Sequence, residues 1–335
     1  MSPPLGISLG DPAGIGPEVV VRALAQRPAV SAVVFGDRGV LARTAAALGL
    51  PVPDRTRDVT RLAPDAVTPG SPNQASAEAT VAYLAAATEA VMRGEISGLV
   101  TAPLSKEWVA RAGFSFPGHT EYLAAAAGVD DFAMMLAGPK LRVTLATIHM
   151  ALRDVARVLT PETIARVVRL TARSLRDSFG FARPRVAVAG FNPHAGEAGR
   201  FGDEEARLVQ PGIALATTML EREGVAAEVS GPHVPDAVFR QAASGQFEAV
   251  VALYHDQGLI PVKMLHFDDA VNVTLGLPFV RTSPDHGTAY DIAGTGRARP
   301  DSFLAALDLA VSMSKSRQGF AEVTAPGVQR AGNLP

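Results

Sequence analysis

The chain has 335 residues, of which 47% are hydrophobic and 19% are charged, and its 31 basic residues are nearly balanced by 33 acidic ones. This balance is typical of an ordinary globular protein and gives no reason to expect bulk binding to nucleic acid. The absence of cysteine excludes disulfides and thiolate metal sites, so any transition metal would need imidazole or oxygen ligands.

The length exceeds that at which one hydrophobic core usually keeps growing, so we expect two domains with the active site in the cleft between them. The N-terminal stretch MSPPLGISLGDPAG has no basic region followed by a long apolar run, and charges or glycines interrupt the Ala-rich stretches. The sequence therefore predicts a cytoplasmic enzyme with no export signal and no membrane segment.

In chain order, short runs of Val, Leu and Ile alternate with Ala-rich stretches of helical spacing, which predicts an α/β fold with parallel strands joined by helices. The predicted strands are 5–10, 29–36, 96–102, 141–148, 185–190, 247–254 and 271–277. The predicted helices are 16–26, 74–93, 105–112, 120–127, 161–179, 203–223, 235–244 and 301–316. The Pro-rich segment 51–74 predicts a long irregular excursion.

Three of the seven histidines directly follow predicted strands, where ligands of open α/β sheets gather. These are His149 after LRVTLATI, His194 in a loop after RVAVAG, and His255 after FEAVVALY. Each histidine alone is more often a hydrogen-bonded loop residue, but together they predict a metal site. Neutral imidazole suits zinc or a neighbouring transition metal better than magnesium. Asp256 could orient a ligand imidazole, or it could simply cap a loop.

Other polar residues suggest an anionic substrate. Lys263 interrupts an apolar run, and Asn272 and Arg281 bracket another, where a buried charge is costly without a partner. A phosphate would be such a partner, although either cation could instead reach water from a buried stem. His119 and Thr120 precede an Ala-rich helix whose N-terminus could bind an anion, or Thr120 could only cap that helix.

The Rossmann fingerprint for a dinucleotide is missing. Neither GDPAGIGPE nor GTGRAR gives G-x-G-x-x-G after a strand, so a standard dinucleotide-binding fold is not expected. Residues 285–298, DHGTAYDIAGTGRA, are dense in Gly, small residues and Asp. Composition alone would also fit a flexible surface loop.

Seven sequence blocks resemble the 4-hydroxythreonine-4-phosphate dehydrogenase family of pyridoxal phosphate biosynthesis over nearly the whole chain. They are, in order, GDPAGIGPEV, TAPLSKE, PGHTEYLA, ATIHMALRDV, GFNPHAGEAGRFGDEE, YHDQGLIPVKML and VNVTLGLPFVRTSPDHGTAYDIAG. Two blocks also resemble GDGIGPEV and HGSAPDIAGKG of isopropylmalate and isocitrate dehydrogenases, whose fold binds NAD without a Rossmann motif. One block departs from the family, because GPHVPDAVF stands where such proteins usually read closer to GPLPADTLF. His233 is therefore not expected to be functional, and the role of Asp236 stays open.

The resemblance implies two α/β/α domains: an NAD-binding domain of residues 1–125 and 275–335, and a metal-binding, substrate-binding and dimerisation domain of residues 126–274. It implies a divalent metal, Zn²⁺ or else Mg²⁺ or Co²⁺, in a site shared between the subunits of a homodimer and ligated by His149, His194 and His255. The implied substrate contacts are His119, Thr120, Lys263, Asn272 and Arg281, and Lys263 and His255 would also be catalytic. NAD or NADP would lie against Gly287, Thr288, Asp291, Gly294 and Gly296.

The implied reaction oxidises the secondary hydroxyl of 4-phosphohydroxy-L-threonine with NAD. The resulting β-keto acid loses carbon dioxide to give 3-amino-2-oxopropyl phosphate. Two alternatives remain open from the sequence: a related dehydrogenase of another hydroxy acid, such as threonate or erythronate 4-phosphate or a cyclic diol carboxylate, and a zinc hydrolase of phosphate esters. The expected partners are a small phosphorylated substrate and a second copy of the chain, with no nucleic acid and no membrane.

Overall fold

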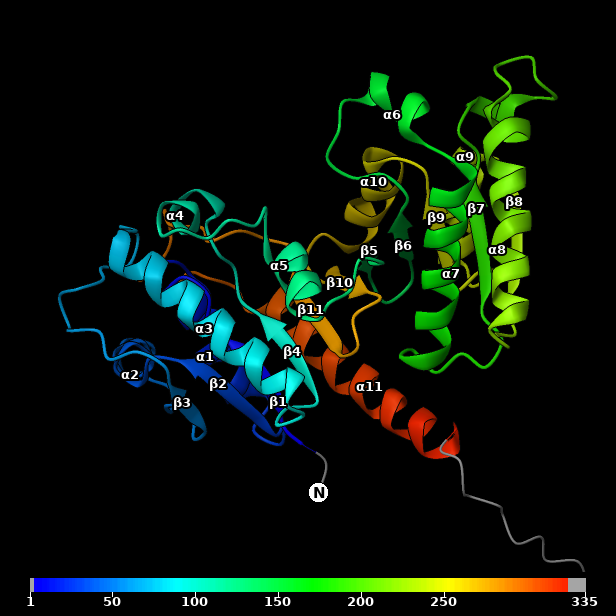
Figure 1. Cartoon of the computed structure of the whole chain (residues 1–335). Helices are drawn as coiled ribbons and strands as arrows, with labels where there is room; N and C mark the ends of the chain where they lie inside the picture. The colour runs from blue at the N-terminus through cyan, green and yellow to red at the C-terminus, as the bar shows by residue number, and fades with distance from the viewer. Residues whose placement is uncertain (1–2, 325–335) are drawn as a thin grey trace, which may run out of the picture.

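The computed structural model describes residues 3–324 and contains one continuous sheet of eleven strands (Figure 1). The strand order across the sheet is β3-β2-β1-β4-β11-β10-β5-β6-β9-β7-β8. The strands are β1 (Leu5–Ser8), β2 (Ala32–Gly36), β3 (Thr56–Asp58), β4 (Gly98–Thr101), β5 (Ala133–Ala137), β6 (Arg142–Leu145), β7 (Arg185–Ala189), β8 (Glu228–His233), β9 (Ala249–Ala252), β10 (Val271–Leu275) and β11 (Val280–Pro284).

Within each end of the sheet the strands are parallel to one another, but the strands of one end run in the opposite direction to those of the other end. Strands β3, β2, β1, β4 and β11 pair in parallel at one end, and β6, β9, β7 and β8 pair in parallel at the other. Between them, β10 is antiparallel to β11 and β5, and β5 is antiparallel to β6. The predicted α/β fold is confirmed, with an antiparallel centre that the sequence pattern did not predict.

Helices cover both faces of the sheet at each end. At the first end, α1 (Gly16–Gln26), α2 (Arg38–Leu48) and α11 (Asp301–Thr324) pack together, and α3 (Gln74–Met92) packs on β1, β2 and β4 beside α4 (Lys106–Arg111). At the second end, α7 (Pro161–Asp177) packs against α8 (Gln210–Arg222), while α9 (Pro235–Ala243) and α10 (His255–His266) pack on β9. The short helices α5 (His119–Ala126) and α6 (Leu152–Val158) follow β4 and β6 in the chain.

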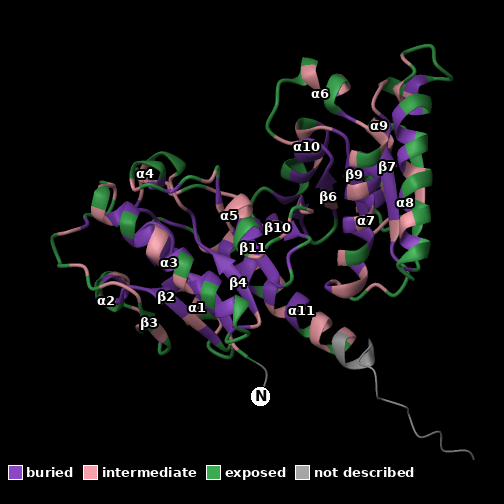
Figure 2. Ribbon diagram, in the orientation of Figure 1, coloured by how far each residue is buried: buried purple, intermediate pink, exposed green. Residues whose placement is uncertain are grey.

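Local sequence explains why these elements form. In α7, Thr160 caps the helix by accepting a hydrogen bond from the Thr163 amide, and Pro161 occupies the first helical position, where no donor is needed. Its apolar residues, among them Ile164 and Val168, recur at helical spacing and are buried. Strand β9, with the sequence AVVA, is buried at every position, as expected for a parallel strand covered on both faces. Figure 2 shows buried residues along the sheet and exposed residues on the outer sides of the helices.

All seven predicted strands are present with shorter bounds, but β3, β5, β8 and β11 were not predicted, and neither were α2, α6 and α10. Helix α10 was hidden by Gly258 and Pro261, which usually interrupt helices. Here Gly258 is needed, because a Cβ on it would lie 2.7 Å from Cγ1 of Val143. Strand β11 was hidden by its polar sequence, VRTSP, yet all five of its residues are buried.

Both ends share one sheet, with the antiparallel β10 and β5 at its centre. The division into residues 1–125 with 275–335 and residues 126–274 stays a prediction, and residues 1–2 and 325–335 of it lie outside the described residues. Within the described range, no helix is long and apolar enough to cross a lipid bilayer.

Candidate functional site

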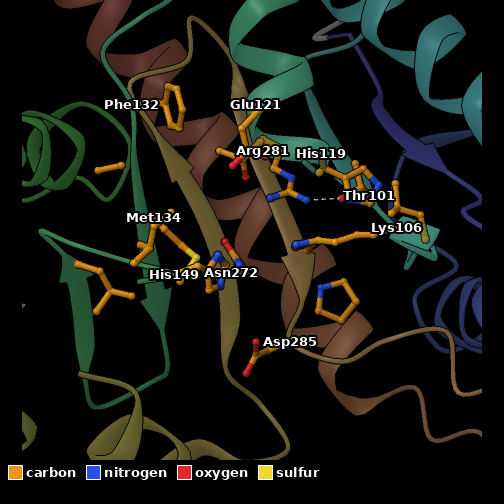
Figure 3. Close-up of a pocket in the computed structure, with 18 of the residues that line it drawn as sticks. Thr101, Lys106, His119, Glu121, Phe132, Met134, His149, Asn272, Arg281 and Asp285 are labelled. Carbon is orange, nitrogen blue, oxygen red and sulfur yellow. Dashed lines mark hydrogen bonds between the residues drawn. The ribbon is translucent and has the colours of Figure 1, made fainter. Parts of the chain in front are cut away.

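A cleft of about 600 Å³ lies where the two ends of the sheet meet, and elements from both ends line it. The segments around α4 and α5, the strands β10 and β11, and the segment after β6 all contribute side chains. Figure 3 shows Arg281, Lys106, Asn272 and His149 pointing into this space. Residues far apart in the chain thus converge on one cavity.

Arg281 is the most unusual group in the cleft, because its guanidinium is buried and forms no ion pair with any carboxylate of the described residues. Only 3% of the residue is exposed. It donates hydrogen bonds to the hydroxyl oxygens of Thr101, at 2.8 Å, and Thr274, at 3.1 Å, while its Nε has no partner within residues 3–324. Burial lowers the pKa of Arg281 to about 10, against a smaller opposing effect of Glu121. A buried cation that lacks a carboxylate partner favours the binding of an anion.

His119 and Thr120 lie beside Arg281 on the first turn of α5. Burial, with the positive charges of Arg281 and Lys106, holds the pKa of His119 well below its usual range, so the imidazole is neutral at physiological pH. Thr120 does not cap the helix as one alternative supposed, because Gly118 is the N-cap residue. The Thr120 hydroxyl instead lies 3.3 Å from that of Thr274.

Asn272 supplies an acceptor to the cleft. It lies on β10, and its side-chain oxygen Oδ1 is buried with no hydrogen-bond partner in the part of the chain that the structure describes. Met134 and Phe132 also line the cleft and make it partly apolar (Figure 3). An orphaned buried acceptor is costly, so it points to a donor group on a bound molecule.

The three strand-end histidines follow β6, β9 and β7, which are adjacent and parallel, as the sequence argument requires. The rings of His149 and His255 have centroids 5.6 Å apart. Nδ1 of His255 lies 2.7 Å from the Asp256 carboxylate, which leaves Nε2 of His255 available for a metal ion. Asp256 therefore contacts His255 as one of its two proposed roles requires.

His194 is exposed, and the described residues do not bring it together with His149 and His255 as a group of three. Its ring lies 6.1 Å from that of Phe201, and the described part of the chain holds no group of three side chains that could bind a metal ion. One copy of the chain thus brings two of the three predicted ligands together.

Lys263 lies on α10 and is half-exposed, and its Nζ is 3.1 Å from the carboxylate of Asp285. Asp285 lines the cleft, whereas Lys263 does not. The partner that the sequence argument sought for this cation is therefore present within the chain itself. Arg281 and Lys263 looked equivalent in sequence but differ in structure.

The segment 285–298 packs against the loop before α1. The Thr288 carbonyl accepts from the Ile15 amide at 2.9 Å, and the Gly296 carbonyl accepts from Arg22 at 2.6 Å. The Gly294 amide donates to the buried carboxylate of Glu18. A second cavity, of about 420 Å³, is lined by Gly294 and Gly296 and by residues of α1 and α2.

The other predicted cofactor residues are placed differently. Gly287 lines the first cleft, and Asp291 is exposed and lines neither cavity. The predicted cofactor residues therefore lie along a segment that connects the two cavities.

Four residues that line the cleft, Thr101, Lys106, Glu121 and His286, were not predicted from the sequence, and neither was Thr274, which accepts a hydrogen bond from Arg281. Thr101 is the last residue of β4, and Lys106 follows that strand. The rule that ligands gather beyond the ends of strands, which singled out the three histidines, could therefore have singled out these residues too. Glu121 and Thr274 carry no such signal, because their places follow from how α5 packs beside β10 and β11.

Comparison with known proteins identifies the family to which the chain is similar. Residues 29–310 match the family model described as pyridoxal phosphate biosynthetic protein PdxA. A 4-hydroxythreonine-4-phosphate dehydrogenase of Desulfosudis oleivorans is 48% identical over 93% of this chain and 96% of its own. The crystal structure of a protein of that name from Klebsiella pneumoniae has a TM-score of 0.84 and 40% identity, covering 93% of this chain and 100% of the other.

A terephthalate 1,2-cis-dihydrodiol dehydrogenase from Burkholderia xenovorans has a TM-score of 0.68 and 31% identity, over 93% of this chain and 98% of its own. This protein has the same fold but is less similar to the chain, in structure and in sequence, than the Klebsiella protein is. The family-model match and the 48% identity cover most of the chain, and the matched range includes His149, His255 and the residues that line the cleft. The chain therefore belongs to the PdxA family of pyridoxal phosphate biosynthetic proteins, a family of dehydrogenase enzymes.

Proposed function

We propose that this enzyme oxidises 4-phosphohydroxy-L-threonine with NAD or NADP. The product is a β-keto acid that loses carbon dioxide to give 3-amino-2-oxopropyl phosphate. The observation that carries the proposal is the buried Arg281 guanidinium, which has no carboxylate partner and opens on a cleft that also holds Lys106 and a neutral His119. Two cations that have no carboxylate partner among the described residues suit the doubly charged phosphate of this substrate.

Different polar groups of the cleft would bind different parts of the substrate. Arg281 and Lys106 attract the anionic groups, and His119 and Thr120 can donate hydrogen bonds from the start of α5. Asn272 Oδ1 accepts from a donor such as the substrate ammonium or hydroxyl group. These contacts orient the substrate between the basic end of the cleft and His149.

His149 and His255 fit a divalent metal, because their rings are adjacent and Asp256 holds the Nδ1 side of His255. We propose His194 of a second copy as the third ligand, since it is exposed and separate from the pair. Zn²⁺ suits three imidazoles best, with Mg²⁺ or Co²⁺ as alternatives. When bound, the metal would acidify the substrate hydroxyl and stabilise the charge that develops as the carboxylate leaves.

An exposed apolar surface on α10 and its C-terminal end supports a homodimer. Ile260, Met264, Leu265 and Phe267 have exposed fractions of 59%, 82%, 52% and 80%. Contiguous apolar side chains this exposed usually mark an interface. The same helix begins at His255, so a partner docked there would lie near the histidine pair and make a metal site shared between subunits geometrically reasonable.

The cofactor is proposed to lie along residues 285–298, with Gly287 and Thr288 near the first cleft and Gly294 and Gly296 at the second cavity. The first end of the sheet would then form the cofactor domain, and residues 126–274 the metal-binding and dimerisation domain. Lys263 would assist catalysis by leaving its ion pair with Asp285 and contacting the substrate. His255 would assist catalysis by binding the metal.

A second candidate is a dehydrogenase of another hydroxy acid, such as threonate or erythronate 4-phosphate or a cyclic diol carboxylate. The similarity to a terephthalate 1,2-cis-dihydrodiol dehydrogenase supports this second candidate, because the name of that protein describes a substrate without phosphate. A zinc phosphohydrolase is a weaker candidate, and it would share the anion site but not the need for NAD.

The test is a panel of these substrates incubated with the purified protein, NAD or NADP, and Zn²⁺, Mg²⁺ or Co²⁺. We expect reduced nicotinamide to form fastest with 4-phosphohydroxy-L-threonine, together with carbon dioxide. Faster reduction with a different hydroxy acid would establish the second candidate. Phosphate release without any reduced nicotinamide would show a hydrolase and refute both dehydrogenase assignments.

A further inference from the structure

The loop that carries His194 has an unusual backbone. His194, Ala195, Glu197 and Ala198 have φ angles of 54°, 51°, 42° and 56°, all in the left-handed region that residues with a side chain rarely adopt. Gly196, between them, has a φ of 80°. Such a run does not persist unless the surrounding structure holds it, and it occurs mostly where a side chain must be presented in a fixed direction.

A buried carboxylate holds the start of this loop. Glu205 is 5% exposed, and its Oε1 accepts hydrogen bonds from the backbone amides of Phe191, at 2.8 Å, and Asn192, at 2.7 Å. Its Oε2 accepts from Nδ2 of Asn192 at 3.1 Å. No basic side chain in the described residues forms an ion pair with Glu205. A buried carboxylate satisfied only by loop donors is costly to keep, so its use here needs a reason.

The loop and the carboxylate are in close contact. A Cβ placed on Gly196 would lie 2.6 Å from Oε2 of Glu205, so the loop folds directly over this carboxylate. The loop's origin is fixed as well, because Nε2 of Gln257 donates to the Gly190 carbonyl at 2.7 Å while its Oε1 accepts from the Leu253 amide. Gln257 lies two residues after His255, so its two hydrogen bonds connect the start of the loop that carries His194 to the segment that carries His255.

We propose that Glu205 is a positioning residue that presets the left-handed loop so that His194 reaches the metal in its binding geometry. The inference rests on the proposed role of His194 as a metal ligand. Without the three hydrogen bonds, residues 191–198 would sample ordinary backbone conformations, and metal binding would have to restore the loop. Residues that orient metal ligands typically change metal affinity by about tenfold to a hundredfold when they are removed.

The test compares the dissociation constant of Co²⁺ or Zn²⁺, measured by chelator competition on the full-length protein, for Glu205→Ala, Glu205→Gln and Glu204→Gln. Glu204 is the matched control, because it neighbours Glu205 and, among the described residues, its carboxylate accepts from the Asn192 side chain, at 2.7 Å, and from no backbone amide. We expect Glu205→Ala to weaken metal binding by about tenfold to a hundredfold and Glu204→Gln to change it less than about twofold. Glu205→Gln should fall between them, because the glutamine oxygen can still accept from the two backbone amides, whereas its NH2 group would face the Asn192 Nδ2 donor and could not accept from it.

The outcomes separate this inference from the proposed function. If His194→Ala binds metal as tightly as the wild type, His194 is not a ligand, and the proposed metal site fails together with the inference. If His194→Ala loses metal but both Glu205 variants bind it normally, the metal site stands and Glu205 does not position it. Should Glu205→Ala not fold, Glu205→Gln decides alone, and a wild-type dissociation constant for that variant overturns the inference.

Discussion

Replacing Arg281 with methionine should change stability and activity in opposite directions. The difference between the ordinary arginine pKa of 12.5 and the value of about 10 here corresponds to about 3 kcal/mol of unfavourable burial of the charged form. Methionine keeps most of the volume without the charge. Thr101 and Thr274 would each lose a donor, which we expect to cost about 1–2 kcal/mol in total. The ligand-free variant should therefore be more stable by about 1–2 kcal/mol.

The same change should remove the main anion partner of the cleft. We expect kcat/KM for the phosphorylated substrate to fall about 100-fold to 1000-fold, which corresponds to about 3–4 kcal/mol of lost transition-state stabilisation. Urea unfolding followed by circular dichroism measures the first effect, and initial rates of nicotinamide reduction measure the second.

Arg142→Met is the matched control. Burial also lowers the pKa of Arg142, but this guanidinium lies over the rings of Phe179 and Phe181, each 5.4 Å away, and does not line the cleft. Its loss should reduce stability, through the lost cation–π contacts, and leave kcat/KM unchanged. The reasoning fails if Arg281→Met is less stable than the wild type, or if it keeps full activity.

Four further predictions follow the same logic. His194→Ala should lose bound metal and turnover while the fold survives, and full metal occupancy by elemental analysis would contradict this. Gly294→Val should raise the KM for NAD more than that for substrate, because Gly294 has a φ of 77° and a Cβ there would lie 2.6 Å from Pro69; an unchanged NAD dependence would argue against the cofactor assignment. Lys263→Met should lower kcat/KM about tenfold to a thousandfold with metal content unchanged, and wild-type kinetics would leave Lys263 with only a structural pair. Because the pKa of His119 is lowered in the folded state, stability should fall as pH decreases below the unfolded value of about 6.5, toward the lowered pKa, and His119→Gln should flatten this part of the pH profile of urea unfolding.

The sequence allowed the parallel parts of the fold to be predicted because strands such as β9 are buried on both faces and appear as uninterrupted apolar runs. The antiparallel hairpin of β10 and β11 could not be predicted in the same way. Its turn depends on Gly276, which has a φ of 95° and packs so closely on the Asp131 carbonyl that no Cβ would fit. Whether a glycine marks a turn or a close approach depends on neighbours that are distant in sequence.

The candidate site shows the same division. The strand-end rule found His149 and His255, because β6 and β9 are neighbours and their ends must lie close together. It could not show that His194 stays apart within one chain, since this depends on the shape of a loop whose left-handed residues carry no sequence signal. Nor could spacing show that Asp285, 22 residues further along the chain, pairs with Lys263.

The contrast between Arg281 and Lys263 suggests how the cleft distinguishes an empty state from a bound one. Lys263 and Asp285 are both partly exposed, so their ion pair contributes little stability and can be exchanged at little cost. Arg281 is buried and has only hydroxyl partners, so its charge stays poorly compensated until an anion arrives. Binding energy should therefore come mainly from Arg281. In the proposed reaction, Lys263 would leave Asp285 when the substrate binds and would act on the group that reacts. This separation of a permanent anion site from an exchangeable cation would suit the proposed binding of a phosphorylated substrate and release of a smaller phosphorylated product.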